Sequence, residues 1–148
     1  PIRQRLAAFK RCAKKYGFAD DPKLFEIAEL SFRGGYEAGE RLWNSLQQKP
    51  TAIVTFSDVV AVGLLHFLDV AGIAVPAEVS VASFDGTVVS EFTHRTLSTV
   101  YTPMYEIGKQ AFALLLGAME GQYGQPQSVL LPVELKLRES TGRAATRH

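Results

Sequence analysis

The feature that most constrains the fold is a pair of short apolar strands, each of which runs into a polar residue. The first strand, Ala52–Phe56, leads directly into Ser57 and Asp58. The second, Val79–Phe84, leads into Asp85. Short apolar runs of this kind are typical of the buried strands of a parallel sheet. Because ligands bind at the carboxyl ends of such strands, the sequence predicts a ligand site at these polar residues.

The other segments alternate between helix and strand patterns. Helices are expected over Ile2–Tyr16, Gly35–Gln48, Val59–Ala71 and Pro103–Gly121, and further strands over Leu24–Leu30, Leu97–Tyr101 and Ser128–Leu137. This alternation predicts an α/β fold with a mainly parallel sheet flanked by helices. The helix Val59–Ala71 is apolar almost all round, whereas a surface helix needs one apolar stripe. We therefore expect it to bury one face on the sheet and one on a partner; the alternative is a central helix within a single domain.

Composition and charge exclude several classes of protein. With 148 residues, 47% of them hydrophobic, and a net charge of +1, we expect one globular unit without strong affinity for nucleic acid or membrane surfaces. The single cysteine, Cys12, rules out a disulfide framework and is expected to be a small core residue in a protein of a reducing compartment. Since no apolar run reaches 18 residues, we predict no membrane span.

Residue sets for catalysis or metal binding are missing from the sequence. It contains no GxxxxGKS/T, GxGxxG, HExxH or GxSxG pattern and no Cys/His cluster with metal spacing. We predict no catalytic residue, no metal and no cofactor, and rank an α/β enzyme third among the possible functions. The polar positions favour recognition of a small polar ligand, because Asp85 at a strand end can accept two hydrogen bonds and Arg5 near a helix start can pair with hydroxyls or a carboxylate.

Several sequence motifs occur along the chain: RQRLAAF (3–9), GYEA (35–38), FSDVVAVG (56–63), GIAVP (72–76), VSVASFD (79–85), LSTV (97–100), LPVEL (131–135) and REST (138–141). In this order and spacing they together resemble the effector-binding domain of lactose-repressor-type (LacI/GalR) transcription factors. The corresponding family patterns are RxRLxGF, SGYxA, ANDxxAxG, GxxVPxDVSVxGFD, LTTV and LPxELxxRxST. Each motif alone is weak, whereas their order and spacing are specific and cover nearly the whole chain.

The resemblance implies a periplasmic-binding-protein-like fold of two α/β subdomains, with the effector in the cleft between them. Residues 1–102 would be the C-terminal subdomain without its first strand. Residues 103–131, a helix and a strand, would belong to the N-terminal subdomain, and residues 132–148 would be the return strand and tail. The chain begins with Pro rather than Met and is interpreted as a fragment. The DNA-binding domain would lie outside it.

The resemblance also assigns site residues. The positions that match effector-contacting or cleft positions of the family are Arg5, Leu30, Ser57, Asp85, Tyr101, Thr102 and Met104. Ser57 stands where the family commonly has Asn, and Gly86 where a second acidic or polar residue is usual. Leu30 replaces an aromatic residue that stacks on the ligand ring, a role that nearby Phe32 could take. Retention of the arginine and the aspartate favours a sugar or sugar derivative as the effector.

The implied function is that of a cytoplasmic, ligand-sensing, homodimeric domain of a DNA-binding transcriptional repressor. Its partners would be a small-molecule effector, a second copy, and operator DNA through a domain absent from this chain, with no membrane. Dimer contacts are expected at Val59, Val62 and His66 and in the loop Val88–Thr96. The alternative is an exported, monomeric sugar-binding protein of a transport system. A signal peptide or a helix-turn-helix upstream would discriminate between the two.

Overall fold

The computed structural model describes residues 2–18 and 21–144. In chain order these form α1 (Ile2–Lys15), the 3₁₀ turn η1 (Pro22–Leu24), α2 (Phe32–Ser45), β1 (Ala52–Val54), α3 (Asp58–Val70), β2 (Ser80–Asp85), the 3₁₀ turn η2 (Val88–Glu91), β3 (Ser98–Tyr101), α4 (Met104–Met119) and β4 (Glu134–Lys136). The sheet runs in the order β1-β2-β3-β4. Since β1, β2 and β3 pair in parallel and β4 is antiparallel to β3, the expected α/β class with a mainly parallel sheet is confirmed.

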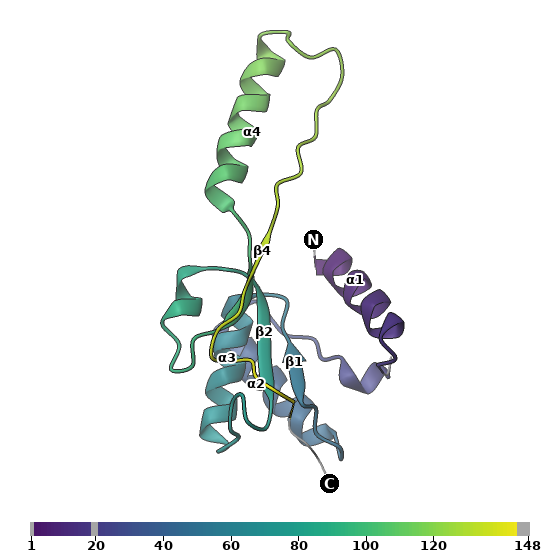
Figure 1. Cartoon of the computed structure of the whole chain (residues 1–148), viewed down its shortest axis with the longest axis vertical. Coiled ribbons are helices and arrows are strands. Elements are labelled where there is room, and N and C mark those ends of the chain that lie inside the picture. Colours follow the sequence, from purple (N-terminus) through teal and green to yellow (C-terminus); the bar gives the residue numbers. More distant parts are fainter. Residues whose placement is uncertain (1, 19–20, 145–148) are drawn as a thin grey trace.

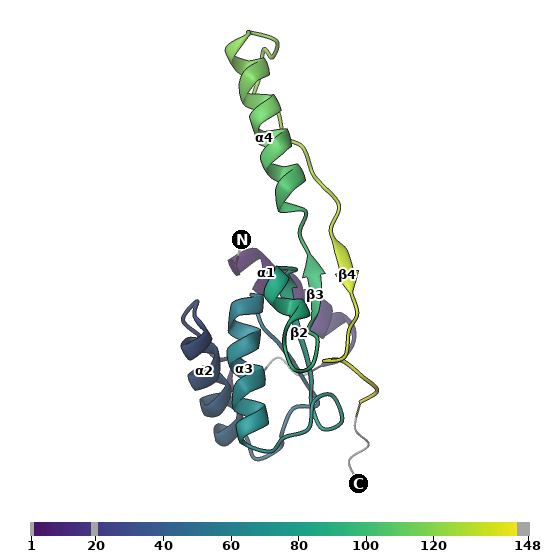
Figure 2. The same ribbon diagram turned by 90° about the vertical axis from the view of Figure 1, so that its left-hand side faces the viewer.

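The core lies between the sheet and α3, which α2 covers in turn (Figure 2). Leu64, Phe67 and Leu68 of α3 pack in one cluster with buried side chains of the sheet. The helices approach each other at glycines: a Cβ atom on Gly63 would lie 1.9 Å from the carbonyl oxygen of Phe32. This contact explains why a helix this apolar carries a glycine at its centre.

The outer face of α3 is less covered than its inner face. Val59 and Val62 are half-buried and His66 is exposed, although the His66 ring lies 5.6 Å from that of Tyr36 on α2. The helix therefore has one fully buried side and one side that is partly open. That this partly open side contacts a partner stays a prediction.

The expected strand Leu24–Leu30 is wrong. Asp21 instead caps a single 3₁₀ turn by accepting a hydrogen bond from the Lys23 amide at 2.9 Å, and residues 25–30 that follow are irregular. A strand needs a neighbouring strand with which to pair. Among the described residues, β1 pairs with β2, and residues 25–30 pair with no strand. Ile27 is accordingly 89% exposed. The expected burial of Cys12 is wrong as well: it is exposed, because among the residues of α1 only Ala13 is buried.

An arm projects from the body of the molecule (Figure 1). It consists of α4 and the irregular segment 122–133 that returns to β4. The final strand is shorter than the expected Ser128–Leu137, because Pro132 lacks an N–H and pairing begins only at Glu134. Gly117 is the only buried residue that α4 contributes, against the ring of Tyr123. Most apolar side chains of the arm therefore face outward.

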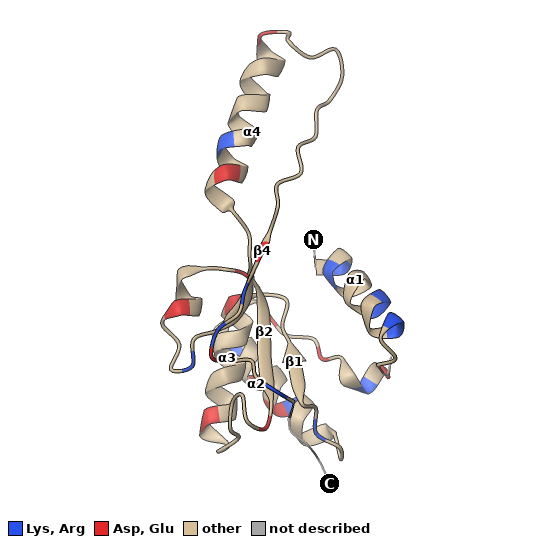
Figure 3. Ribbon diagram, in the orientation of Figure 1, with Lys and Arg blue, Asp and Glu red and all other residues tan. Residues whose placement is uncertain are grey.

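The charged residues are scattered over the body, and α1 carries basic but no acidic side chains (Figure 3). None of the helices within the described ranges is long and apolar enough to cross a membrane. The same residues hold no cluster of metal-ligating side chains. The end of the expected tail, residues 145–148, lies outside the described residues.

Candidate ligand site at the carboxyl end of the sheet

Arg5 and Asp85, predicted as a pair of ligand contacts, meet at the carboxyl end of the sheet. The Arg5 Nη2 atom lies 3.0 Å from Asp85 Oδ1, and the two side chains are 28% and 21% exposed. Arg5 Nη1 also donates to the carbonyl oxygen of Phe56, at 2.7 Å, and the guanidinium lies 4.9 Å from the centroid of the Phe84 ring. A side chain of α1 thus joins the ends of two strands. Because the pair is open to solvent, it can exchange its mutual contact for contacts to a ligand.

The backbone at Asp85 is unusual. Its φ of 107° makes it a non-glycine residue with positive φ, and Gly86 follows with φ 69°. A Cβ atom on Gly86 would lie 2.6 Å from Tyr101 Cα, so a side chain cannot be accommodated there without a shift. The close contact and the positive φ both suit glycine at this position. Strained conformations of this kind concentrate at binding sites.

Tyr101 and Thr102 lie beside this corner. Tyr101 pairs with Asp85 across β2 and β3 and is 40% exposed. The Thr102 amide donates to the carbonyl oxygen of Asp85 at 3.1 Å. Met104, the first residue of α4, is 60% exposed and donates its amide to the Thr102 carbonyl at 2.8 Å. The backbone therefore links the Asp85 corner directly to the start of the arm.

Ser57 and Leu30 are placed differently. Ser57 is 5% exposed and occupies the N-cap of α3, but its side chain makes no capping hydrogen bond. Leu30 is 64% exposed and precedes Ser31, the N-cap of α2. Thus Ser57 directly follows Phe56, whose carbonyl holds Arg5, whereas Leu30 lies in the irregular segment that replaces the expected strand.

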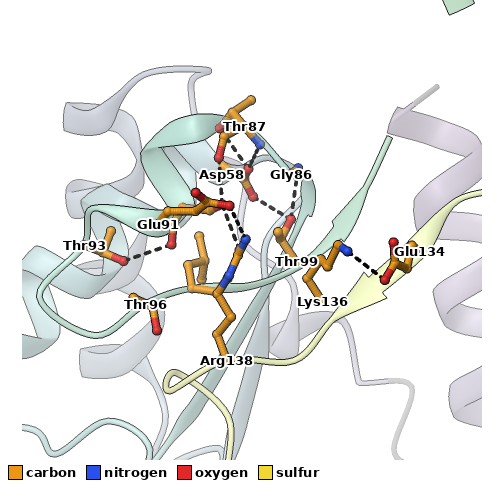
Figure 4. Close-up of polar contacts among 12 residues, drawn as sticks. Asp58, Gly86, Thr87, Glu91, Thr93, Thr96, Thr99, Glu134, Lys136 and Arg138 are labelled. Carbon is orange, nitrogen blue, oxygen red and sulfur yellow. Dashed lines mark hydrogen bonds and ion pairs between the residues drawn. The ribbon is translucent and has the colours of Figure 1, made fainter. Parts of the chain in front are cut away.

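Asp58, one of the polar residues expected at this ligand site, makes contacts there that the sequence did not reveal. It is 0% exposed, and its carboxylate accepts hydrogen bonds from Ser83. It also accepts hydrogen bonds from Thr87 and Thr99 (Figure 4). The sequence did not predict the hydrogen-bond network around its carboxylate. The signal that could have located it is a set of hydroxyl residues at or near the ends of the following strands, since a buried carboxylate requires donors.

The loop after the corner is tied to the C-terminal segment. The Arg138 guanidinium donates to Ser90 Oγ at 3.0 Å and to the Leu97 carbonyl at 2.9 Å, and pairs with Glu91 at 2.8 Å. Glu139 accepts from the backbone N–H of Thr96 at 3.0 Å and from its hydroxyl at 2.9 Å. The hydrogen bond from the Thr96 backbone N–H has the larger effect and that from the Thr96 hydroxyl the smaller; both lower the pKa of Glu139. These contacts, of which Figure 4 shows that between Arg138 and Glu91, fasten the loop that carries part of the predicted dimer surface.

Comparison with known proteins identifies relatives over nearly the whole chain. A model of the periplasmic binding protein-like domain family matches residues 1–141. The HTH-type transcriptional repressor CytR of Escherichia coli is 35% identical over 137 residues, which cover 93% of this chain and 40% of the relative. The chain thus spans about two fifths of the length of the curated relatives it matches.

Solved structures of regulators superpose closely on this fold. A putative transcriptional regulator LacI from Bacillus cereus subsp. cytotoxis has a TM-score of 0.89 at 29% identity, covering 97% of this chain and 50% of that one. A LacI family transcriptional regulator from Enterococcus faecium, with bound ribose, has a TM-score of 0.87 at 25% identity, covering 99% of this chain and 53% of that one.

Proposed function

This chain belongs to the periplasmic binding protein-like domain family, in the group found in LacI-type transcriptional regulators, and we propose that it is the ligand-sensing part of such a regulator. The observation that carries the proposal is the ion pair between Arg5 and Asp85 at the carboxyl end of the sheet. The relatives are named as transcriptional regulators, not as enzymes or exported binding proteins. This favours sensing over transport on the same fold.

The chemistry of the corner favours a small molecule with neighbouring hydroxyls. A carboxylate such as that of Asp85 can accept two hydrogen bonds and a guanidinium such as that of Arg5 can donate two in one plane, which suits a pair of adjacent hydroxyl groups. The ring of Phe84, whose centroid lies 4.9 Å from the guanidinium carbon, packs against this group. The ribose bound to the Enterococcus faecium regulator belongs to this chemical class. We therefore expect a sugar or a sugar-containing compound.

The arm supplies a route from the ligand to the rest of a regulator. We propose that residues 103–131 belong to a second subdomain, whose apolar surface covers the exposed side of α4. Because the amide of Thr102 is bonded to Asp85 and that of Met104 to Thr102, a ligand at the corner acts on the start of α4. A ligand that binds a closed cleft better than an open one shifts the balance between them by the difference in its affinities.

The remaining steps involve partners. We propose that a second copy packs against the outer face of α3, at Val59, Val62 and His66, and against residues 88–96. Operator DNA would be bound through a domain outside this chain, in the cytoplasm. Closure of the cleft would then move the second subdomains of a dimer relative to each other, and with them the DNA-binding domains.

A thermal-shift screen of the native protein tests the sensing function. The compounds are ribose, sucrose, sugar phosphates, nucleosides and inorganic phosphate. A compound that binds only the folded state at 100 times its Kd adds about 2.7 kcal/mol of stability. We expect one sugar-containing class to raise the unfolding midpoint by several degrees. A screen in which no such compound raises the midpoint contradicts the proposed function.

A further inference from the structure

We propose that Asp58 is a positioning residue for the ligand site, because its carboxylate fixes the turn at residues 85–87 that presents Asp85 to Arg5. The consequence for ligand binding rests on the proposed function. The geometry itself exists without a ligand and can be tested without one.

The carboxylate of Asp58 is buried and fully used. Its Oδ1 atom accepts hydrogen bonds from Ser83 Oγ and, at 2.7 Å, from Thr99 Oγ1. Its Oδ2 atom accepts from the Thr87 amide at 2.6 Å and the Thr87 hydroxyl at 2.9 Å. Hydrogen bonds to a charged group are about twice as strong as neutral ones, and a satisfied buried network holds its members rigidly.

Two of these contacts anchor the residues that follow Asp85. The Thr87 amide bonds directly to the carboxylate of Asp58. The Gly86 amide donates to Thr99 Oγ1 at 3.2 Å, and the same hydroxyl donates to Asp58, so that it acts as a relay. Both amides after Asp85 are therefore held by one side chain (Figure 4).

The anchoring accounts for the strained backbone of Asp85. A non-glycine residue in such a region is strained and persists only where its surroundings fix it. The surroundings here are the Thr102 amide on its carbonyl and the anchored amides of Gly86 and Thr87 behind it. The side chain of Asp85 then lies 3.0 Å from Arg5.

A role limited to helix capping does not account for these contacts. Asp58 lies in the first turn of α3, where a negative charge is favourable. However, its described hydrogen bonds come from β2, from β3 and from the turn after β2. The residue joins the start of α3 to the ligand corner, and its effect is expected there.

The test uses amide resonances as a local signal. We compare Asp58→Asn and Thr99→Val with Thr55→Val, a matched control. Thr55 is a buried threonine whose hydroxyl donates to the Ser57 carbonyl at 3.0 Å, outside the Asp58 network. Hydrogen exchange at Gly86 and Thr87 is measured by two-dimensional NMR without any ligand. Circular dichroism and the fluorescence of Trp43 establish that each variant is folded.

We expect Asp58→Asn to accelerate exchange at Gly86 and Thr87, and Thr99→Val to accelerate it at Gly86, each by about tenfold or more, because each variant removes a hydrogen bond that anchors these amides. Thr55→Val leaves these two amides unchanged. Thr99→Val keeps the test decisive if Asp58→Asn does not fold. The proposal is overturned if the folded variants leave exchange at Gly86 and Thr87 unaltered, or accelerate it equally throughout β2 and α3.

The two failures are distinguishable. A thermal-shift screen without a sugar-containing hit contradicts the sensing function, even where the amides of Gly86 and Thr87 respond to Asp58→Asn. Unresponsive amides contradict the positioning role, even where a sugar raises the midpoint.

Discussion

The helices α3 and α4 have similar apolar sequences and opposite surroundings. In α3, Leu64 is 3% and Leu68 0% exposed, whereas in α4 Phe112 is 62% and Leu115 57% exposed. The difference arises from topology: α3 lies between the sheet and α2, while α4 leaves the body after β3 (Figure 1). An apolar sequence indicates that a helix buries its surface against other elements. Within this chain, the sheet and α2 bury the surface of α3. Exposed apolar patches of this kind mark interaction surfaces, which supports a second subdomain around α4.

The largest effect is expected from leucine truncations that compare the two helices. We expect Leu68→Ala to lower the free energy of unfolding of this chain by about 2–5 kcal/mol, because it leaves a cavity in the core. Leu115→Ala, at an exposed site, should change it by no more than about 0.5 kcal/mol. Urea unfolding followed by Trp43 fluorescence measures both. Equal losses would show that the two helices are packed alike.

Glycine-to-alanine variants sharpen the comparison by predicting opposite signs. In α3, the new Cβ of Gly63→Ala would lie 1.9 Å from the Phe32 carbonyl oxygen and force α2 away. We expect a loss of about 1–3 kcal/mol. In α4, a Cβ on Gly108 meets no atom within 4 Å. There alanine should stabilise the helix by up to about 1 kcal/mol. Thermal unfolding midpoints that shift in the same direction in both variants would contradict this prediction.

A charge on the outer face of α3 tests the proposed dimer. We expect Val62→Asp to weaken self-association of the native protein by about tenfold or more, because an unpaired charge is costly to bury in an interface. Val129→Asp, on the exposed return segment of the arm, serves as the control. Sedimentation at micromolar concentration reports both. A dimer that Val62→Asp leaves intact would remove α3 from the interface.

The smallest expected effect is a dependence of stability on pH that arises from Glu139, which fastens the C-terminal segment to Thr96. Bonds from Thr96 lower the pKa of Glu139 below its usual value of 4.5. Its contribution to stability is therefore present above that value and lost as the pH falls through the lower pKa of the folded state. Glu139→Gln should destabilise the chain slightly at neutral pH, with the difference from wild type disappearing in acid. A difference that is independent of pH, in urea unfolding, would exclude this contribution.

The sequence predicted the parts of the fold that depend on local patterns. Alternating apolar segments located the described α-helices to within a few residues and predicted the mainly parallel sheet. Polar residues at strand ends indicated the corner at Asp85, where the structure also places Arg5. The strand expected at Leu24–Leu30 was wrong because pairing depends on a neighbouring strand, which a local pattern does not report. The burial of Cys12 was wrong because the packing of α1 depends on what lies opposite it.

The details of the site depend on contacts distant in sequence. Asp58 lies 29 residues from Thr87 and 41 from Thr99, and no local pattern connects them. Arg5 and Phe84 are likewise distant in sequence, and no local pattern predicts their contact. The φ of 107° at Asp85 likewise results from these contacts, since an aspartate alone predicts no such conformation. Motifs therefore indicated which residues gather at the corner, while the geometry that prepares it required the structure.

The most direct test of the account is the affinity of Asp85→Ala for the compound that raises the unfolding midpoint in the screen. Asp69→Ala, at an exposed position of α3, is the matched control. Calorimetry of the folded variants should show a loss of about 100-fold or more for Asp85→Ala, as expected for removing hydrogen bonds to a charged group, and none for Asp69→Ala. Near-normal affinity of Asp85→Ala would place the ligand elsewhere and contradict the site.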